Sequence, residues 1–119
     1  MKKLLFVLAM LFSSSSFAMT GNDFVKYIEN KNTEHVPFFY ISGYLDAFAV
    51  NRILAKSVAE NSGTSFPYFA FICMPDGSNK KQATSIIKKY IYDNPAENHE
   101  DMANIIYSAL IKDWRWKEQ

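Results

Sequence analysis

The side chains that could do chemistry are few in this sequence. Cys73 is the only cysteine, between an apolar run and a Pro-Asp-Gly turn, and His35 and His99 are the only imidazoles. A thiolate nucleophile needs a nearby base and an electropositive, partly exposed setting. A buried cysteine behaves instead as a small apolar residue. The apolar neighbours favour burial, so we predict a structural cysteine. A cysteine-dependent hydrolase, which Cys73→Ser would inactivate, is the alternative.

Acidic and metal-binding patterns are equally sparse. Glu100 and Asp101 are adjacent, so they point in different directions on a helix and are interpreted as charges at a helix start. The sequence contains no CxxC, HExxH or EF-hand loop, and its four glycines form no phosphate-binding loop. We therefore predict that the protein is not an enzyme and uses no metal or cofactor.

Two further features could serve a structure or an interface. Asp46 lies among apolar residues, and a buried carboxylate needs partners. We predict a hydrogen bond to a loop or to Tyr44, with an interface anchor as the alternative. Trp114 and Trp116 flank an arginine, a composition that is enriched at binding hot spots. Trp114 is predicted to cover the core, whereas for Trp116 an exposed ring and a binding residue are both open.

The elements that must position these residues are helical. We predict four helices, at residues 22–31, 37–61, 80–93 and 98–114. Asn22 is the expected N-cap of the first, and Pro37 suits the first turn of the second. Gly63 suits the left-handed conformation expected just after the end of the second helix. Asn79 and Gln82 have the spacing of a capping box.

Apolar periodicity defines the faces that these helices bury. In the long helix the stripe is Phe38, Ile41, Leu45, Phe48 and Arg52, with Tyr44 and Leu54 near it. In the last helix it is Ala103, Ile106, Tyr107, Leu110 and Trp114. Residues 64–74 have a strand-like composition, but an isolated strand is unstable, so we predict an extended or short helical connection. The predicted fold is all-α, a small bundle of about four helices with an extended connection before the third.

The N-terminal segment, residues 1–18, has the plan of a secretory signal peptide. Lys2 and Lys3 precede nine apolar residues, and Ala18 is the predicted cleavage point. Nine residues are too few for a bilayer span of roughly 20, so no stable membrane anchoring is expected. Residues 19–119 form one predicted domain, and the shortage of cysteine favours a bacterial periplasm. Without the signal, eleven basic residues stand against twelve acidic ones, which offers no electrostatic case for nucleic acid.

Three segments resemble the Rap/Tai family of type VI secretion amidase immunity proteins. In chain order they are YISGYLDAF (40–48), FICMPDGSNKKQATSIIKKYIYDNP (71–95) and DMANIIYSALIKDWRW (101–116). The most specific pattern is Cys-x-Pro-x-Gly-x-x-x-x-Gln, at Cys73, Pro75, Gly77 and Gln82. The resemblance implies a small helical periplasmic protein that needs no cofactor. Its implied partners are a peptidoglycan amidase, whose active-site cleft it blocks, and a second copy in a homodimer.

The sequence departs from the family in its cysteines. Family members carry further cysteines before the second-helix motif and near the C-terminus, where this chain has Pro37 and Trp116. One cysteine forms no intramolecular disulfide, a cross-link worth roughly 2–4 kcal/mol. Buried aromatic side chains are expected to offset that loss.

The candidate binding surfaces are residues 61–68, 76–79 and 97–101, together with the C-terminal tryptophan. Their candidate residues are Asn61, Ser62, Thr64, Tyr68, Asp76, Ser78, Asn98, His99, Glu100 and Trp116. The sequence does not choose among the three surfaces. The alternative function is a small periplasmic acid-stress chaperone or another helical binding module, which would protect clients at low pH and bind no amidase.

Overall fold

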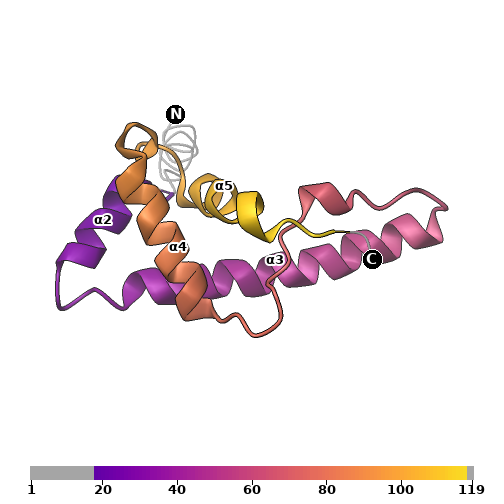
Figure 1. Ribbon diagram of the computed structural model, residues 1–119, viewed down its shortest axis with the longest axis horizontal. Coiled ribbons are helices and arrows are strands. Elements are labelled where there is room, and N and C mark those ends of the chain that lie inside the picture. The colour runs from indigo at the N-terminus through magenta and orange to yellow at the C-terminus, as the bar shows by residue number, and fades with distance from the viewer. Residues whose placement is uncertain (1–17, 118–119) are drawn as a thin grey trace, which may run out of the picture.

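A computed structural model of the chain describes residues 18–117. The α-helices of this part are α2 (Gly21–Glu29), α3 (Val36–Asn61), α4 (Lys80–Asp93) and α5 (Met102–Trp114), and the 3-10 turns are η1 (Tyr68–Ala70) and η2 (Pro95–Glu97). The predicted all-α bundle is therefore confirmed (Figure 1). None of the helices between residues 18 and 117 has the length and hydropathy needed to cross a bilayer. Residues 1–17, which hold almost all of the predicted signal peptide, lie outside the described part.

Helix α2 begins one residue earlier than predicted, because Thr20 rather than Asn22 is its N-cap. The Thr20 hydroxyl accepts a hydrogen bond from the Asp23 backbone N–H, and the Asp23 carboxylate accepts one from the Thr20 backbone N–H at 3.1 Å. This reciprocal pair is a capping box with aspartate in the place of the usual Glu or Gln. The hydrogen bonds donated by the Thr20 backbone and hydroxyl lower the pKa of Asp23 below its ordinary value of 3.8.

That cap predicts a specific acid sensitivity. The depressed pKa of Asp23 stabilises the fold above the unfolded-state value of 3.8, and this contribution is lost as the pH falls through the lower folded-state value. Replacing Asp23 with asparagine should reduce stability at pH 7 and flatten its decline below pH 3.8. Denaturant unfolding at several pH values measures both effects, and Asp76→Asn controls for the lost charge. An equally steep acid decline in Asp23→Asn would contradict the assignment.

Helix α3 runs from Val36 to Asn61, as predicted to within one residue, with Pro37 in its first turn. Gly63 has φ +65°, the left-handed conformation expected after the helix end. At about 1.5 Å per residue the helix is roughly 39 Å long. Its first half packs under α4 and its second half extends past the bundle (Figure 1). Leu54, predicted to lie near the buried stripe, is instead 58% exposed.

Helix α4 has the predicted bounds, and the Asn79 side chain accepts a hydrogen bond from the Gln82 backbone N–H at 2.9 Å. The predicted start of α5 at residue 98 is wrong, because residues 98–101, which follow η2, form a turn and the helix begins at Met102. Residues 98–101 instead form the loop on which the N-terminus of α2 docks. The backbone N–H of Asn22 donates to the Asn98 carbonyl at 2.8 Å, and that of Gly21 donates to the Glu100 carbonyl at 3.1 Å.

The core lies between the four helices. Its members are Phe24, Ile41, Leu45, Ile72, Ala83, Ile87, Ile91, Met102, Ile105, Ile106, Ala109, Leu110 and Trp114. Trp114 is 7% exposed, which confirms its predicted place over the core. Ala103, predicted on the buried stripe of α5, is exposed, because the buried side of the helix is turned towards Met102, Ile105 and Ala109 and away from Ala103.

The segment before α4 is extended, with the short turn η1 inside it, as predicted. It runs back along α3 towards the bundle (Figure 1). Its partner is the C-terminal tail, through an isolated antiparallel bridge between Ile72 and Arg115. The chain after α3 and the chain after α5 therefore lie side by side on the second half of the long helix.

Candidate partner-binding site

An aromatic cluster joins this returning connection to the tail. Its members are Phe48, Phe66, Tyr68, Phe71 and Trp116. The Trp116 ring stands edge-on to Tyr68 at 5.1 Å between centroids and to Phe66 at 5.6 Å. Phe71 stacks on Phe66 at 4.9 Å and reaches Phe48 of α3 at 5.7 Å. Edge-to-face and offset pairs at such distances stabilise beyond the area they bury.

Backbone hydrogen bonds hold the tail in this position. The Cys73 backbone N–H donates to the Trp114 carbonyl at 2.7 Å, and the Trp116 backbone N–H donates to the Phe71 carbonyl at 2.7 Å. The Tyr107 hydroxyl of α5 donates to the Ala70 carbonyl at 2.9 Å. These bonds tie the connection to both α5 and the tail without a covalent cross-link.

Two cations of α3 complete the cluster. The Arg52 guanidinium carbon lies 4.5 Å from the centroid of the Trp116 ring, within the range of a cation–π contact. The same guanidinium donates to the Ile72 carbonyl at 3.2 Å. The Lys56 ammonium lies 5.7 Å from the Trp116 ring and 6.0 Å from Tyr68. The second half of α3 therefore carries aromatic rings together with positive charge, and Trp, Tyr and Arg are enriched at binding hot spots.

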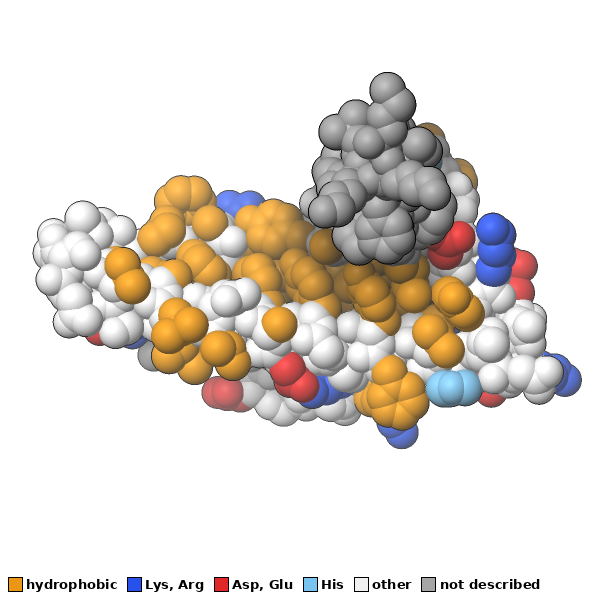
Figure 2. Space-filling model, turned by 180° about the vertical axis from the view of Figure 1, so that it is seen from behind, with side chains coloured by type: hydrophobic (Ala, Val, Ile, Leu, Met, Phe, Trp, Pro, Cys, Tyr) orange, Lys and Arg blue, Asp and Glu red, His pale blue; other side chains and the backbone are white. Residues whose placement is uncertain are grey.

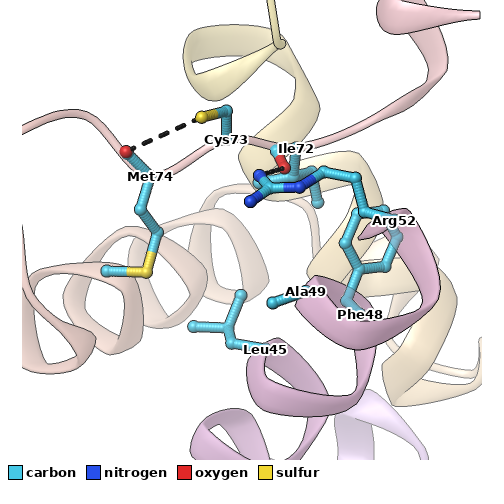
Figure 3. A pocket seen from close by; sticks show the side chains of 7 residues that line it. All are labelled: Leu45, Phe48, Ala49, Arg52, Ile72, Cys73 and Met74. Carbon is cyan, nitrogen blue, oxygen red and sulfur yellow. Dashed lines mark hydrogen bonds between the residues drawn. The ribbon is translucent and has the colours of Figure 1, made fainter. Parts of the chain in front are cut away.

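Cys73 lies beside a small pocket of about 160 Å³ where residues 72–74 meet the middle of α3 (Figure 3). The lining side chains come from α3 and from residues 72–74. Cys73 is a free, partly buried cysteine, and its thiol lies 3.9 Å from the Met74 carbonyl. Figure 3 shows its side chain turned away from Leu45 and Ala49 on the floor of the pocket. The predicted burial is thus partial, and the thiol is not aimed into the cavity.

The two histidines lie far from this thiol. His35 precedes α3, about 15 Å along the helix from the pocket residue Leu45. His99 lies in the loop before α5, with its Nδ1 2.9 Å from the Ala96 carbonyl. Cys73 is bonded to Trp114 at the opposite end of α5. The fold does not assemble a cysteine–histidine pair.

The structure brings one group of the predicted binding residues together. Asn61, Ser62 and Thr64 lie exposed at the end of α3, and the Thr64 backbone N–H donates to the Ala59 carbonyl at 2.9 Å. Tyr68 and Trp116, which are far apart in the sequence, pack against each other. We call this region, the end of α3 with residues 61–71 and the tail 115–117, the arm tip.

The other two predicted surfaces lie elsewhere. The Asp76–Ser78 turn stands at the start of α4, where the Ser78 hydroxyl donates to the Pro75 carbonyl at 2.6 Å. His99 and Glu100 are exposed near the start of α2, at the end of the molecule away from the arm tip (Figure 1). Asn98 is only 8% exposed, because α2 docks on it, so its side chain is not available as a surface contact.

Asp46 is not the buried carboxylate that was predicted. Its side chain is 69% exposed and pairs with the Lys80 ammonium of α4 at 2.7 Å, rather than with a loop or Tyr44. Exposed pairs of this kind contribute at most about 1 kcal/mol. The pair is a minor tie between α3 and the start of α4.

Sequence reasoning missed Arg52 and Lys56 as members of the binding region, together with Phe66 and Phe71. The signal that was available is the spacing of Arg52, Lys56 and Glu60, which places three charged side chains on one side of the second half of α3. The contacts with Trp116 need the returning connection and the tail, which no local pattern encodes.

The fold and the arm tip define a small all-α protein with an aromatic and cationic projection. No family model matches the chain, and no curated protein or solved structure is significantly similar to it.

Proposed function

We propose that the protein is a periplasmic immunity protein that binds and occludes a peptidoglycan amidase delivered by a type VI secretion system. The observation that carries the proposal is the arm tip. It packs Tyr68 against Trp116 along the second half of α3 and presents the exposed residues Asn61, Ser62 and Thr64 at the end of that helix, which extends past the bundle (Figure 1). A projection of this kind suits entry into a cleft.

The segments that resemble the immunity family support the same proposal. They lie on the first half of α3, on the turn with α4, and on α5 with the tail, so they build the body that holds the arm. Binding by such a surface needs no cofactor. Residues 61–68 and Trp116 are the preferred contact among the three candidate surfaces, because two of its members are aromatic and close to cations.

Co-expression tests the function. A candidate amidase, such as one encoded beside this chain's gene, is directed to the periplasm with and without the protein. We expect lysis with the amidase alone and growth when the full chain is present. A matched chain lacking residues 1–18 should fail to protect, because it would not meet the amidase. Unchanged lysis with the full chain would contradict the proposal.

The second candidate function is an acid-stress chaperone. The observation that favours it is the exposure of Val50, Ile53, Leu54 and Val58 on α3, since exposed aliphatic side chains can bind unfolded clients. Light scattering of an aggregating client at low pH distinguishes the two functions. Protection of the client together with no amidase binding at neutral pH would replace the first proposal with the second.

A further inference from the structure

The charges of the described chain are divided between two parts of the molecule. We call residues 50–72 and 115–117, which are the second half of α3, the returning connection and the tail, the arm. The arm carries four basic residues and one acidic residue, a net charge of +3. The rest of residues 18–117 carries seven basic and ten acidic residues, a net charge of −3. The arm is therefore a positive projection on a negative body, which favours an anionic partner surface.

The single acid of the arm does not cancel this positive charge. Glu60 lies 4.0 Å from the Lys56 ammonium, so its carboxylate is paired within the arm. The tail adds two exposed cations, Arg115 and Lys117, on either side of Trp116. Neither of them forms an ion pair with another residue between positions 18 and 117. These two side chains are therefore free to contact negative groups outside the protein.

Phe69 is an exposed aromatic side chain on the same projection. It follows Tyr68 in the turn η1, and whereas Tyr68 packs on Trp116, Phe69 is 69% exposed. Burial of an aromatic side chain is among the largest apolar contributions that one residue makes. The fold of the described chain leaves this contribution unused, so it is available for binding.

The arm is apolar on both sides of α3. Leu54 is 58% exposed, and Arg52, two positions before it, lies about 200° around the helix and contacts Trp116. Phe69 belongs to the connection on the Trp116 side, so exposed apolar side chains flank the helix on opposite sides. Figure 2 shows hydrophobic side chains over the half of the molecule that the arm forms, on the left in that view. A bilayer interface can contact an inserted projection on several sides at once.

The remaining residues of the arm suit the headgroup region of a bilayer. Residues 61–75 contain no charged side chain, so this part of the chain takes no ion into the lipid. Tyr68 and Trp116 belong to the residue types that are enriched at membrane–water interfaces. Lysine and arginine lay their carbon stems along apolar surface and keep their charged ends at the level of the headgroups.

We propose that the arm binds reversibly to an anionic bilayer surface, with Phe69 inserted among the lipids and with Arg115 and Lys117 at the phosphates. Each basic residue near such a surface strengthens binding roughly fivefold. The contact is peripheral, since no helix between residues 18 and 117 is long and apolar enough to cross the bilayer. Charge and insertion together give an affinity that neither provides alone.

This inference does not use the amidase, so its test needs only the protein and lipid. The secreted form is purified from the periplasm and mixed with vesicles of phosphatidylglycerol and phosphatidylcholine, and co-sedimentation measures the bound fraction. We expect binding at least about 10-fold tighter than to vesicles of phosphatidylcholine alone, weakened by added salt. All variants have the same N-terminus, so the differences between them report the arm. The proposed inhibition of an amidase is decided separately, by co-expression.

Phe69→Ala should weaken binding to the anionic vesicles about fivefold, because an aromatic side chain is withdrawn from the lipid. Phe39→Ala is the matched control, since Phe39 is 66% exposed but lies near the start of α3, outside the arm. It should bind like the wild type. Far-UV circular dichroism checks that both variants are folded, which is expected because both rings are exposed.

A pair of charge reversals provides the second test. Lys117→Glu should weaken binding at low salt at least about fivefold. Lys81→Glu, at an exposed lysine of α4, should have a much smaller effect. Equal binding to anionic and neutral vesicles would overturn the proposal, and so would equal losses within either matched pair of variants. Binding of a soluble polyanion without binding of vesicles would assign the charge of the arm to another partner and overturn it as well.

Discussion

Replacing Gly21 with alanine should destabilise the protein by about 3 kcal/mol, at the upper end of what overpacking typically costs. A Cβ at this position would lie 2.7 Å from Ile105 Cδ1 and 2.9 Å from the Cα atom of Asn98. The isoleucine side chain can move, but the Asn98 backbone is held by its hydrogen bond from Asn22. The better helix propensity of alanine, worth at most about 1 kcal/mol, does not offset that clash.

Denaturant unfolding measures this change, and a domain of about 100 residues should lose roughly 4–8 °C of Tm per kcal/mol. Asn22→Ala is the matched control, because the adjacent side chain is exposed and its removal should stay within about 0.5 kcal/mol. Gly21→Val, whose side chain has two more carbons than alanine, should be less stable than Gly21→Ala. Equal stability of Gly21→Ala and Asn22→Ala would show that α2 does not dock tightly on residues 98–101.

The same docking explains why some helix ends could be predicted and others could not. The bounds of α4 follow from signals within the chain itself, namely the Asn79 cap and the stop at Pro95. The start of α5 does not, because residues 98–101 have a helix-like composition but use their carbonyls to accept bonds from the start of α2. The position at which α5 begins therefore depends on a contact with α2, at the other end of the described chain.

The faces of α3 show a second limit of sequence reasoning. Its first half buries Ile41 and Leu45 as the periodicity predicts. In its second half the helix leaves the bundle, so Leu54 stays exposed while Arg52 and Lys56 lie under the tail. Periodicity finds an apolar side, but it does not say whether this chain or another protein covers it.

Some residues of the candidate site were predicted from the sequence, but Arg52, Lys56, Phe66 and Phe71 were missed, and the assembly of the site was not predictable. Tyr68 was named as part of the candidate loop of residues 61–68, and Trp116 was named because it adjoins Arg115. Their contact, and the involvement of Phe66, requires residues 64–73 to turn back along α3 and pair with the tail. Such pairing between segments that are distant in sequence leaves no local signature.

Trp116→Ala is expected to have the largest effect on function. The variant loses the ring that packs on Phe66 and Tyr68 and lies under the Arg52 guanidinium. We expect a loss of about 2 kcal/mol of stability, roughly half the cost of removing a fully buried aromatic side chain, because Trp116 is partly exposed. Affinity for the proposed amidase partner should fall at least about 30-fold, as for a central hot-spot residue.

Hydrogen exchange shows whether the tail detaches in this variant. If it does, the backbone amides of Cys73 and Trp116 should lose their protection against exchange, while the amides of the core around Ile106 should stay protected. Trp116→Phe is the matched control, since a smaller ring still fills the site and should retain most of the protection and binding. Lys117→Ala tests the charge of the exposed tail residue alone.

The outcomes of the Trp116→Ala experiment separate the packing of the tail from its role in binding. Full tail protection with full inhibition would contradict both the anchoring of the tail by this ring and the arm tip as the contact surface. Lost protection with full inhibition would keep the anchoring role and exclude the tail from the amidase contact, because a detached tail cannot be part of the inhibitory surface. The proposed contact would then be confined to residues 61–68 or lie on one of the other two predicted surfaces.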